Sequence, residues 1–210
     1  MSLSFFRLLA FATAILLHSS PILAHPHSWI SIKSQINTSE DKITSISMTW
    51  EFDAMTSAYM LAGEGMTSSN QQEVLDRIAH SVINNMLSSH YFTYFYLNQE
   101  PIKYKRVDDA VLTLNGAKLT MHFELLIAKP ININQQGIRL LIFDPTYYVD
   151  MSWDNPGDVQ LAYAGTCQLN VIEPNPTPEQ VTYALSLGPD ESPDNDLGQL
   201  FTQSAEIHCN

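Results

Sequence analysis

The stretch Ser28–Asp53 reads SWISIKSQINTSEDKITSISMTWEFD and carries the clearest structural pattern in the chain. Its two halves place apolar residues at every second position, namely Ile30, Ile32 and Ile36, then Ile46, Met48, Trp50 and Phe52. The polar segment NTSEDK between the halves supplies turn residues. A period of two on both sides of a polar turn is typical of a β-hairpin with one buried face, so we expect two long paired strands here.

The hydrophobic period changes between Gln71 and Leu87. Apolar residues now recur at spacings of three and four, at Leu75, Ile78, Ala79, Val82, Ile83 and Met86. This spacing predicts an amphipathic helix that covers one side of the sheet. The preceding SSN offers a helix cap, and Glu73 lies in the first turn, where the helix dipole favours an acid.

The remainder of the chain is rich in β-branched and aromatic residues. Four runs bounded by Asn, Gly or Pro read HYFTYFYLNQEPIKYKRV, AVLTLNGAKLTMHFELLIAKP, GIRLLIFDPTYYVDMSW and VQLAYAGTCQLNVIEP. They predict five or six further strands with short, mostly antiparallel connections, followed by a short helix near Val181–Leu187. The predicted fold class is α+β: a mostly antiparallel β-sheet or sandwich with one main amphipathic helix and short C-terminal helices, in a single domain over residues 25–210.

The first 24 residues have the composition of a secretory signal peptide. Arg7 is followed by the apolar run LLAFATAILL, a polar break and the small residue Ala24. The run is shorter than the roughly 20 residues that a membrane-spanning helix needs. We therefore expect cleavage after Ala24, His25 as the new amino terminus and no transmembrane segment after cleavage. Retention of the leader as a membrane anchor is the alternative.

Acidic residues dominate the charge, since 22 Asp and Glu face 10 Lys and Arg, for a formal net charge of −12. Such a surface repels nucleic acid and anionic membranes but tolerates cations, although acidity also serves solubility. The chain has two cysteines, Cys167 and Cys209. In an exported protein an even count predicts one disulfide between them. A thiolate metal site is the alternative, but two isolated cysteines lack the paired spacing of such sites.

The sequence His25-Pro26-His27 becomes chemically interesting if His25 is the first residue of the exported chain. An amino-terminal amine and two neutral imidazoles are good ligands for copper, nickel, zinc or cobalt. Proline at the second position has no amide proton, which excludes the square-planar site built from deprotonated amides. What remains is a brace of the amine, His25 and His27, completed by other side chains. The alternative is two polar residues at a frayed terminus.

Two acids are candidates to complete such a metal site. Asp53 and Asp144 both lie at strand ends beside aromatic residues, in WEFDAM and IFDPTYY. Acids in these positions also commonly serve as turn or cap residues. His122 and Glu124 could share a cation on one strand face, but a surface histidine beside an acid is the simpler interpretation. The chain lacks Ser/His/Asp, phosphate-loop, zinc-protease and CxxC signatures, so we do not expect an enzyme.

The chain resembles the DUF1007 family of bacterial periplasmic proteins in five segments, which read LAHPHSWI, TWEFD, YFTYFYLNQEPI, FDPTYYVDM and LGQLFTQSAEIHC. The resemblance runs in order from His25 to Cys209 and includes both cysteines. Its most specific parts are HPH-x-W and FDPTYY. Members are often labelled as periplasmic components of uncharacterised ABC transport systems, and they are often encoded with, or fused to, nickel/cobalt permeases.

The resemblance implies a periplasmic metal-binding accessory protein that handles nickel, cobalt or zinc, with copper as a further candidate, for an inner-membrane metal permease or ABC transporter. The matching positions are His25, His27, Trp29, Asp53, Asp144, Tyr147, Cys167 and Cys209. Many relatives carry an acidic, calcium-loop-like stretch where this chain has LAGEGMTSSNQQE, so no calcium site is expected. The alternatives are a metal-free envelope interaction domain and a histidine-brace copper enzyme, for which His122 is the strand candidate as a further ligand.

Overall fold

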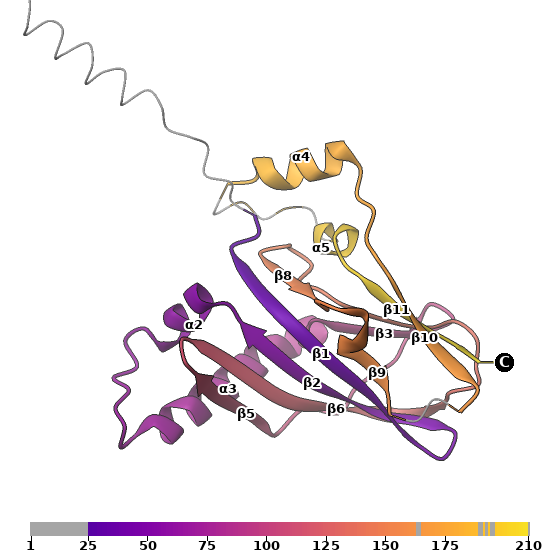
Figure 1. Ribbon diagram of the computed structural model, residues 1–210, viewed down its shortest axis with the longest axis horizontal. Coiled ribbons are helices and arrows are strands. Elements are labelled where there is room, and N and C mark those ends of the chain that lie inside the picture. Colours follow the sequence, from indigo (N-terminus) through magenta and orange to yellow (C-terminus); the bar gives the residue numbers. More distant parts are fainter. Residues whose placement is uncertain (1–24, 163–164, 189–190, 192, 194–195, 210) are drawn as a thin grey trace, which may run out of the picture.

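The computed structural model describes residues 25–162, 165–188, 191, 193 and 196–209. The predicted leader, residues 1–24, lies outside the described residues. Figure 1 shows two β-sheets with helices α2 and α3 on one side of the molecule and α4 and α5 near β8. The strands are β1 (Ser28–Ser39), β2 (Lys42–Phe52), β3 (Thr93–Leu97), β4 (Glu100–Pro101), β5 (Ala110–Asn115), β6 (Lys118–Asn132), β7 (Ile138–Ile142), β8 (Val149–Ser152), β9 (Val159–Leu161), β10 (Cys167–Ile172) and β11 (Ser204–Cys209). The helices are α2 (Ala54–Leu61), α3 (Gln71–Met86), α4 (Pro178–Ser186) and α5 (Leu197–Leu200), with 3-10 turns η1 (Leu87–Phe92) and η2 (Pro156–Asp158).

The larger sheet has the strand order β5-β6-β2-β1-β8, with β9 also paired to β1. The predicted hairpin is confirmed: β1 and β2 pair antiparallel, with Ile36 opposite Ile46 and Ile30 opposite Phe52. The other edge of β1 pairs in parallel with β8 and β9. Sequence reasoning did not predict these parallel pairs, because they bring together segments more than a hundred residues apart.

The smaller sheet has the order β10-β11-β7-β3-β4, and each of its neighbouring pairs is antiparallel. Cys167 and Cys209 are directly opposite each other on β10 and β11. They form a disulfide, which confirms the pairing expected from the sequence. Cross-links of this kind are typical of proteins that fold in oxidising compartments.

The core lies between the inner faces of the sheets and α3. Trp50 is almost completely buried, and its ring meets Phe123 edge-on at a centroid distance of 5.0 Å. The main helix predicted over Gln71–Leu87 is found at Gln71–Met86. Its inward face buries Val74, Leu75, Ile78, Ala79, Ile83 and Met86. The α+β fold class is thereby confirmed.

A second, smaller apolar cluster joins the C-terminal helices to the loop before β8. Ala184 and Leu187 pack with Leu197 against Tyr147 and Phe201. The rings of Tyr147 and Phe201 stack at 4.3 Å. This contact fixes the loop between β7 and β8. Within the described ranges, no helix is both long enough and apolar enough to cross a membrane.

Candidate functional site: a histidine pair at the start of β1

His25 and His27 lie immediately before β1 and beside the loop that leads into β8. The amide of His27 donates a hydrogen bond to the carbonyl of Tyr148 (2.9 Å), so the pairing of β1 with β8 continues into the histidine segment. The imidazole of His27 stacks on the Tyr148 ring at a centroid distance of 4.7 Å. The His25 ring meets the His27 ring at 5.1 Å. The structure therefore brings both predicted histidines together and adds Tyr148 as their support.

One ring nitrogen of each histidine is buried without a hydrogen-bond partner among the described residues. These atoms are Nδ1 of His25 and Nε2 of His27, and the His25 side chain is only 3% exposed. Buried polar atoms in proteins are nearly always paired, so an orphaned nitrogen calls for an explanation. A lone pair on each ring can be satisfied by a metal ion, and the donor set fits that use.

The surroundings of His25 favour the neutral imidazole. Burial lowers the pKa of His25 below its ordinary value, and the neighbouring His27 lowers it further, while Asp144 and Glu191 act in the opposite direction. A neutral ring has a lone pair free for coordination. The His25 ring is therefore ready to bind a cation without first losing a proton at neutral pH.

Asp144 holds the loop that presents Tyr148. Its buried carboxylate accepts hydrogen bonds from the amide of Thr146 (3.0 Å), the hydroxyl of Thr146 (2.9 Å) and the amide of Val149 (3.1 Å). These bonds close a tight turn of the kind that aspartate side chains commonly order. Because Tyr148 lies between the bonded residues, Asp144 sets the position of the ring that supports His27.

Asp53 also orders backbone next to the histidine pair, on the other side of β1. It caps α2, accepting hydrogen bonds from the amides of Met55 (2.7 Å) and Thr56 (3.0 Å), and it also accepts from the amide of Trp29 (3.0 Å). Burial acts to raise the pKa of Asp53, but bonds from the Thr56 hydroxyl and the three amides outweigh it and leave the pKa below its usual value. Asp53 thus fastens the start of β1 to the start of α2.

The four predicted ligands come from three places in the fold: His25 and His27 precede β1, Asp53 follows β2, and Asp144 lies in the loop before β8. Among the residues that the structure describes, no group of three or more His, Cys, Asp or Glu side chains is placed to hold one metal ion. Asp53 and Asp144 flank the histidine pair and position its neighbours, and their use as ligands stays a prediction. His122 lies elsewhere, exposed on β6, with Nδ1 3.0 Å from the Thr49 hydroxyl.

Gly198 in α5 packs directly against the backbone of the turn that begins at Asp144. A Cβ atom at this position would overlap the carbonyl oxygen of Asp144, while the Gly198 amide donates to the carbonyl of Pro145 (3.2 Å). We expect Gly198→Ala to lower the free energy of unfolding by about 1 to 3 kcal/mol, because backbone must move to admit the methyl group. Urea unfolding measures this loss. Gly157→Ala is the matched control, since a Cβ there meets open space; an equal loss in both variants would contradict the argument.

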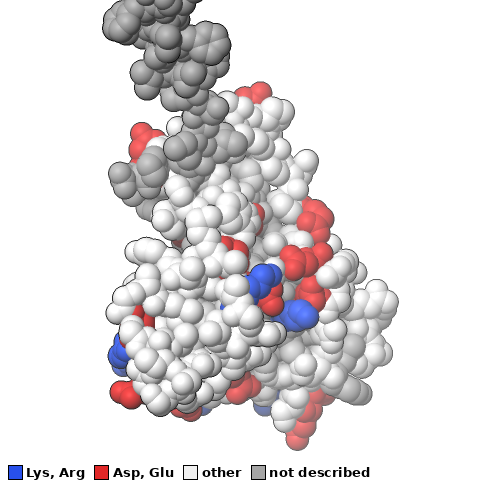
Figure 2. Space-filling view, turned by 60° about the vertical axis from the view of Figure 1, so that its left-hand side comes forward, with Lys and Arg blue, Asp and Glu red and all other residues white. Residues whose placement is uncertain are grey.

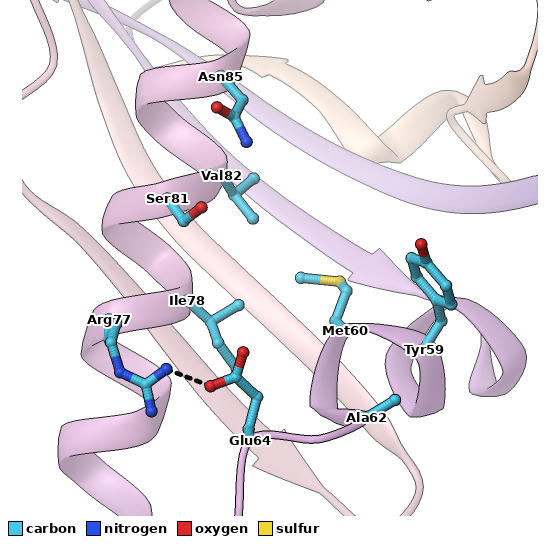
Figure 3. Close-up of a pocket in the computed structure, with 9 residues that line it drawn as sticks. All are labelled: Tyr59, Met60, Ala62, Glu64, Arg77, Ile78, Ser81, Val82 and Asn85. Carbon is cyan, nitrogen blue, oxygen red and sulfur yellow. Dashed lines mark hydrogen bonds and ion pairs between the residues drawn. The ribbon is translucent and has the colours of Figure 1, made fainter.

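A concavity lies between α2 and α3. It has a volume of about 520 Å³. Figure 3 shows Met60, Ile78 and Val82 pointing into it, and Glu64 paired with Arg77 at one end. Apart from Glu64 and Arg77 its lining is uncharged, and those two charges already compensate each other, so we do not place metal chemistry there.

Fold and site together define an α+β protein with two sheets, a disulfide and a histidine pair, one member of it buried, at the start of its first strand. The chain belongs to the family described as "Protein of unknown function (DUF1007)", whose sequence profile matches residues 10–209. It is 32% identical over 194 residues to a protein of Haemophilus influenzae (strain ATCC 51907 / DSM 11121 / KW20 / Rd) described as "Uncharacterized protein". That match covers 90% of this chain and 92% of the relative.

Proposed function

We propose that this protein binds a divalent transition metal ion at His25 and His27 outside the cytoplasmic membrane and passes it to a membrane transporter. The observation that carries the proposal is the pair of buried, unpartnered ring nitrogens on adjacent imidazoles. Leader cleavage after Ala24 adds the amino-terminal amine of His25. That amine and Nδ1 of the same residue can close a six-membered chelate ring, and Nε2 of His27 supplies a third nitrogen.

Three nitrogen donors suit nickel, cobalt, zinc or copper rather than calcium or magnesium, which prefer oxygen ligands. A site made of two residues at a chain terminus leaves coordination positions open. An open site can release its ion to a second set of ligands, which suits transfer rather than storage. The function proposed is therefore binding and delivery, and no catalytic step is proposed.

The surface charge supports a role in handling cations. Figure 2 shows a face on which acidic side chains outnumber basic ones, in agreement with the formal net charge of −12. Such a surface raises the local concentration of cations and speeds their capture. The partner that we propose, an inner-membrane metal permease or ABC transporter, follows from the resemblance to periplasmic transport components.

The test compares two chains that differ by one residue. A chain beginning at His25 is expected to retain one nickel, cobalt, zinc or copper ion in native mass spectrometry at limiting metal. A chain with one extra alanine before His25 turns the amine into an amide and is expected to bind zinc or cobalt, which do not displace an amide proton, on the order of a hundredfold more weakly, because the chelate ring is lost. Equal retention by both chains would exclude the amine, and no retention by either would overturn the proposal.

A further inference from the structure

Four large apolar side chains are exposed at the start of β1, in the loop before β8 and on α2, and we call them the aromatic shelf: Tyr148 (47% exposed), Trp29 (48%), Met55 (70%) and Tyr59 (83%). Tyr148 carries the stacked His27 ring. Trp29 follows His27 by two residues and so lies on the same face of β1. Single exposed apolar residues are ordinary, but a contiguous group beside a functional site marks an interaction surface.

Asp53 ties together the backbone that carries two parts of the shelf. The carboxylate of Asp53 accepts from the amides of both Trp29 and Met55, and the hydroxyls of Ser28 and Thr56 lie 2.7 Å apart. The first turn of α2 is therefore anchored to the start of β1. Tyr59 follows Met55 by one helical turn and extends the shelf along α2; Figure 3 shows it at the rim of the α2–α3 cleft.

An acid without a hydrogen bond or an ion pair from the described residues lies on the strand next to Trp29, where it also acts on the phenol of Tyr147. Asp150 on β8 is paired with Trp29 across the parallel strands, so both side chains project from the outer face while Ile30 and Met151 are buried. Among the described residues, none donates a hydrogen bond or a salt bridge to the Asp150 carboxylate. Burial raises the pKa of this carboxyl above its ordinary value, which means that its charged form gains from an added cation.

The charge around the shelf is not compensated by its basic neighbour. Lys118 is already paired with Glu51 (2.7 Å), and Asp53 and Asp154 also act on its ammonium group. Asp150 and Asp53 therefore leave the shelf with an excess of negative charge. An anionic membrane or a nucleic acid would be repelled, whereas a basic polypeptide would be attracted.

We propose that the aromatic shelf is a docking surface for a partner protein that places an arginine side chain between Trp29 and Asp150 and an apolar segment over Met55 and Tyr59. A guanidinium stacks on an indole face and pairs with a carboxylate at the same time, which a compact ammonium does less well. Apolar side chains around an aromatic anchor are typical of energetically important interface regions. This docking does not require metal at the histidine pair.

The test uses a defined peptide and the folded chain beginning at His25. The acetylated peptide amide GLRLG is titrated against the isotope-labelled protein and followed by NMR at the Trp29 indole and the backbone amides of β8 and α2. We expect shifts confined to the shelf, and none with the matched peptide GLELG. Asp150→Asn, which keeps the side-chain volume, and Trp29→Leu, which keeps an apolar side chain but removes the aromatic ring, are each expected to weaken binding about fivefold, because each removes one contact of the guanidinium.

Asp108→Asn is the control, since it removes the same charge from an exposed loop residue and should change the affinity less than twofold. Equal weakening by Asp108→Asn and Asp150→Asn would overturn the proposal, because the peptide would then respond only to net charge. NMR shifts of the Trp29 indole that change with protein concentration in the absence of peptide would show that the shelf binds a second copy of the chain. That result would also overturn the proposal. Thermal unfolding of each variant, measured before titration, separates a lost contact from a lost fold.

Discussion

The double substitution His25→Ala, His27→Ala is expected to abolish tight binding of divalent transition metals and to leave the domain folded. It removes both imidazole donors and keeps only the amine, so affinity should fall more than about a thousandfold, as expected when a chelate becomes a single ligand. The fold should survive because both residues precede β1. The unpartnered ring nitrogens make no hydrogen bond that the substitution would break. Isothermal titration with nickel, zinc and copper measures the affinity, and thermal unfolding checks the fold.

His122→Ala is the control for this experiment. His122 is an exposed strand histidine whose Nδ1 contacts the Thr49 hydroxyl, and its removal should leave metal affinity unchanged. A loss of affinity in His122→Ala equal to that of the double variant would move the site to the outer face of β6. Unchanged affinity in the double variant would contradict the histidine pair as the site.

The fold was predictable to the extent that its pattern is local. The alternation across Ser28–Asp53 and the spacing across Gln71–Leu87 each reflect one buried face, and the structure has β1, β2 and α3 there. Helix α2 was missed because AMTSAYML has no clear apolar stripe. Its formation depends on the Asp53 cap and on packing beside β1 and β6.

Parts of the site could not be predicted, because they depend on parallel pairing between distant segments. The HPH motif drew attention to His25 and His27, but no sequence pattern brings Tyr148 to His27 until β8 pairs with β1. Asp53 and Asp144 were singled out as ligands from the same feature, a strand end beside aromatic residues, that also makes a good cap or turn. Their hydrogen bonds show that they hold the flanking loops in place.

Tyr148 could have been suspected from the doubled tyrosine in FDPTYYVD. The two tyrosines lie in the turn before β8, where the positive φ of Tyr147 reverses the backbone and lets the two rings serve two surfaces. Tyr147 stacks on Phe201 beneath the C-terminal helices, and Tyr148 stacks on His27. The pair therefore links the C-terminal cluster to the histidine site through adjacent residues of one loop.

Removing the disulfide by Cys167→Ala with Cys209→Ala is expected to lower the free energy of unfolding by about 3 to 4 kcal/mol. The two cysteines are separated by 42 positions, and opening a loop of this length restores about that much chain entropy to the unfolded state. The folded state should change little, because the two residues are also direct partners in the β10–β11 pairing. Urea unfolding at 25 °C measures the loss.

The closed loop contains α4 and α5, whose apolar residues pack against Tyr147. Those contacts form in the folded chain whether or not the cross-link is present. The variant should therefore bind metal at 25 °C as the wild type does, but its unfolding midpoint should fall at a lower urea concentration. Reduced wild-type protein is the matched comparison, because it loses the same cross-link without a change of sequence. A loss below about 1 kcal/mol in both the double variant and the reduced wild type would contradict this expectation. It would mean that the unfolded chain keeps these strands together without the cross-link, because the disulfide stabilises only by restricting a disordered unfolded state.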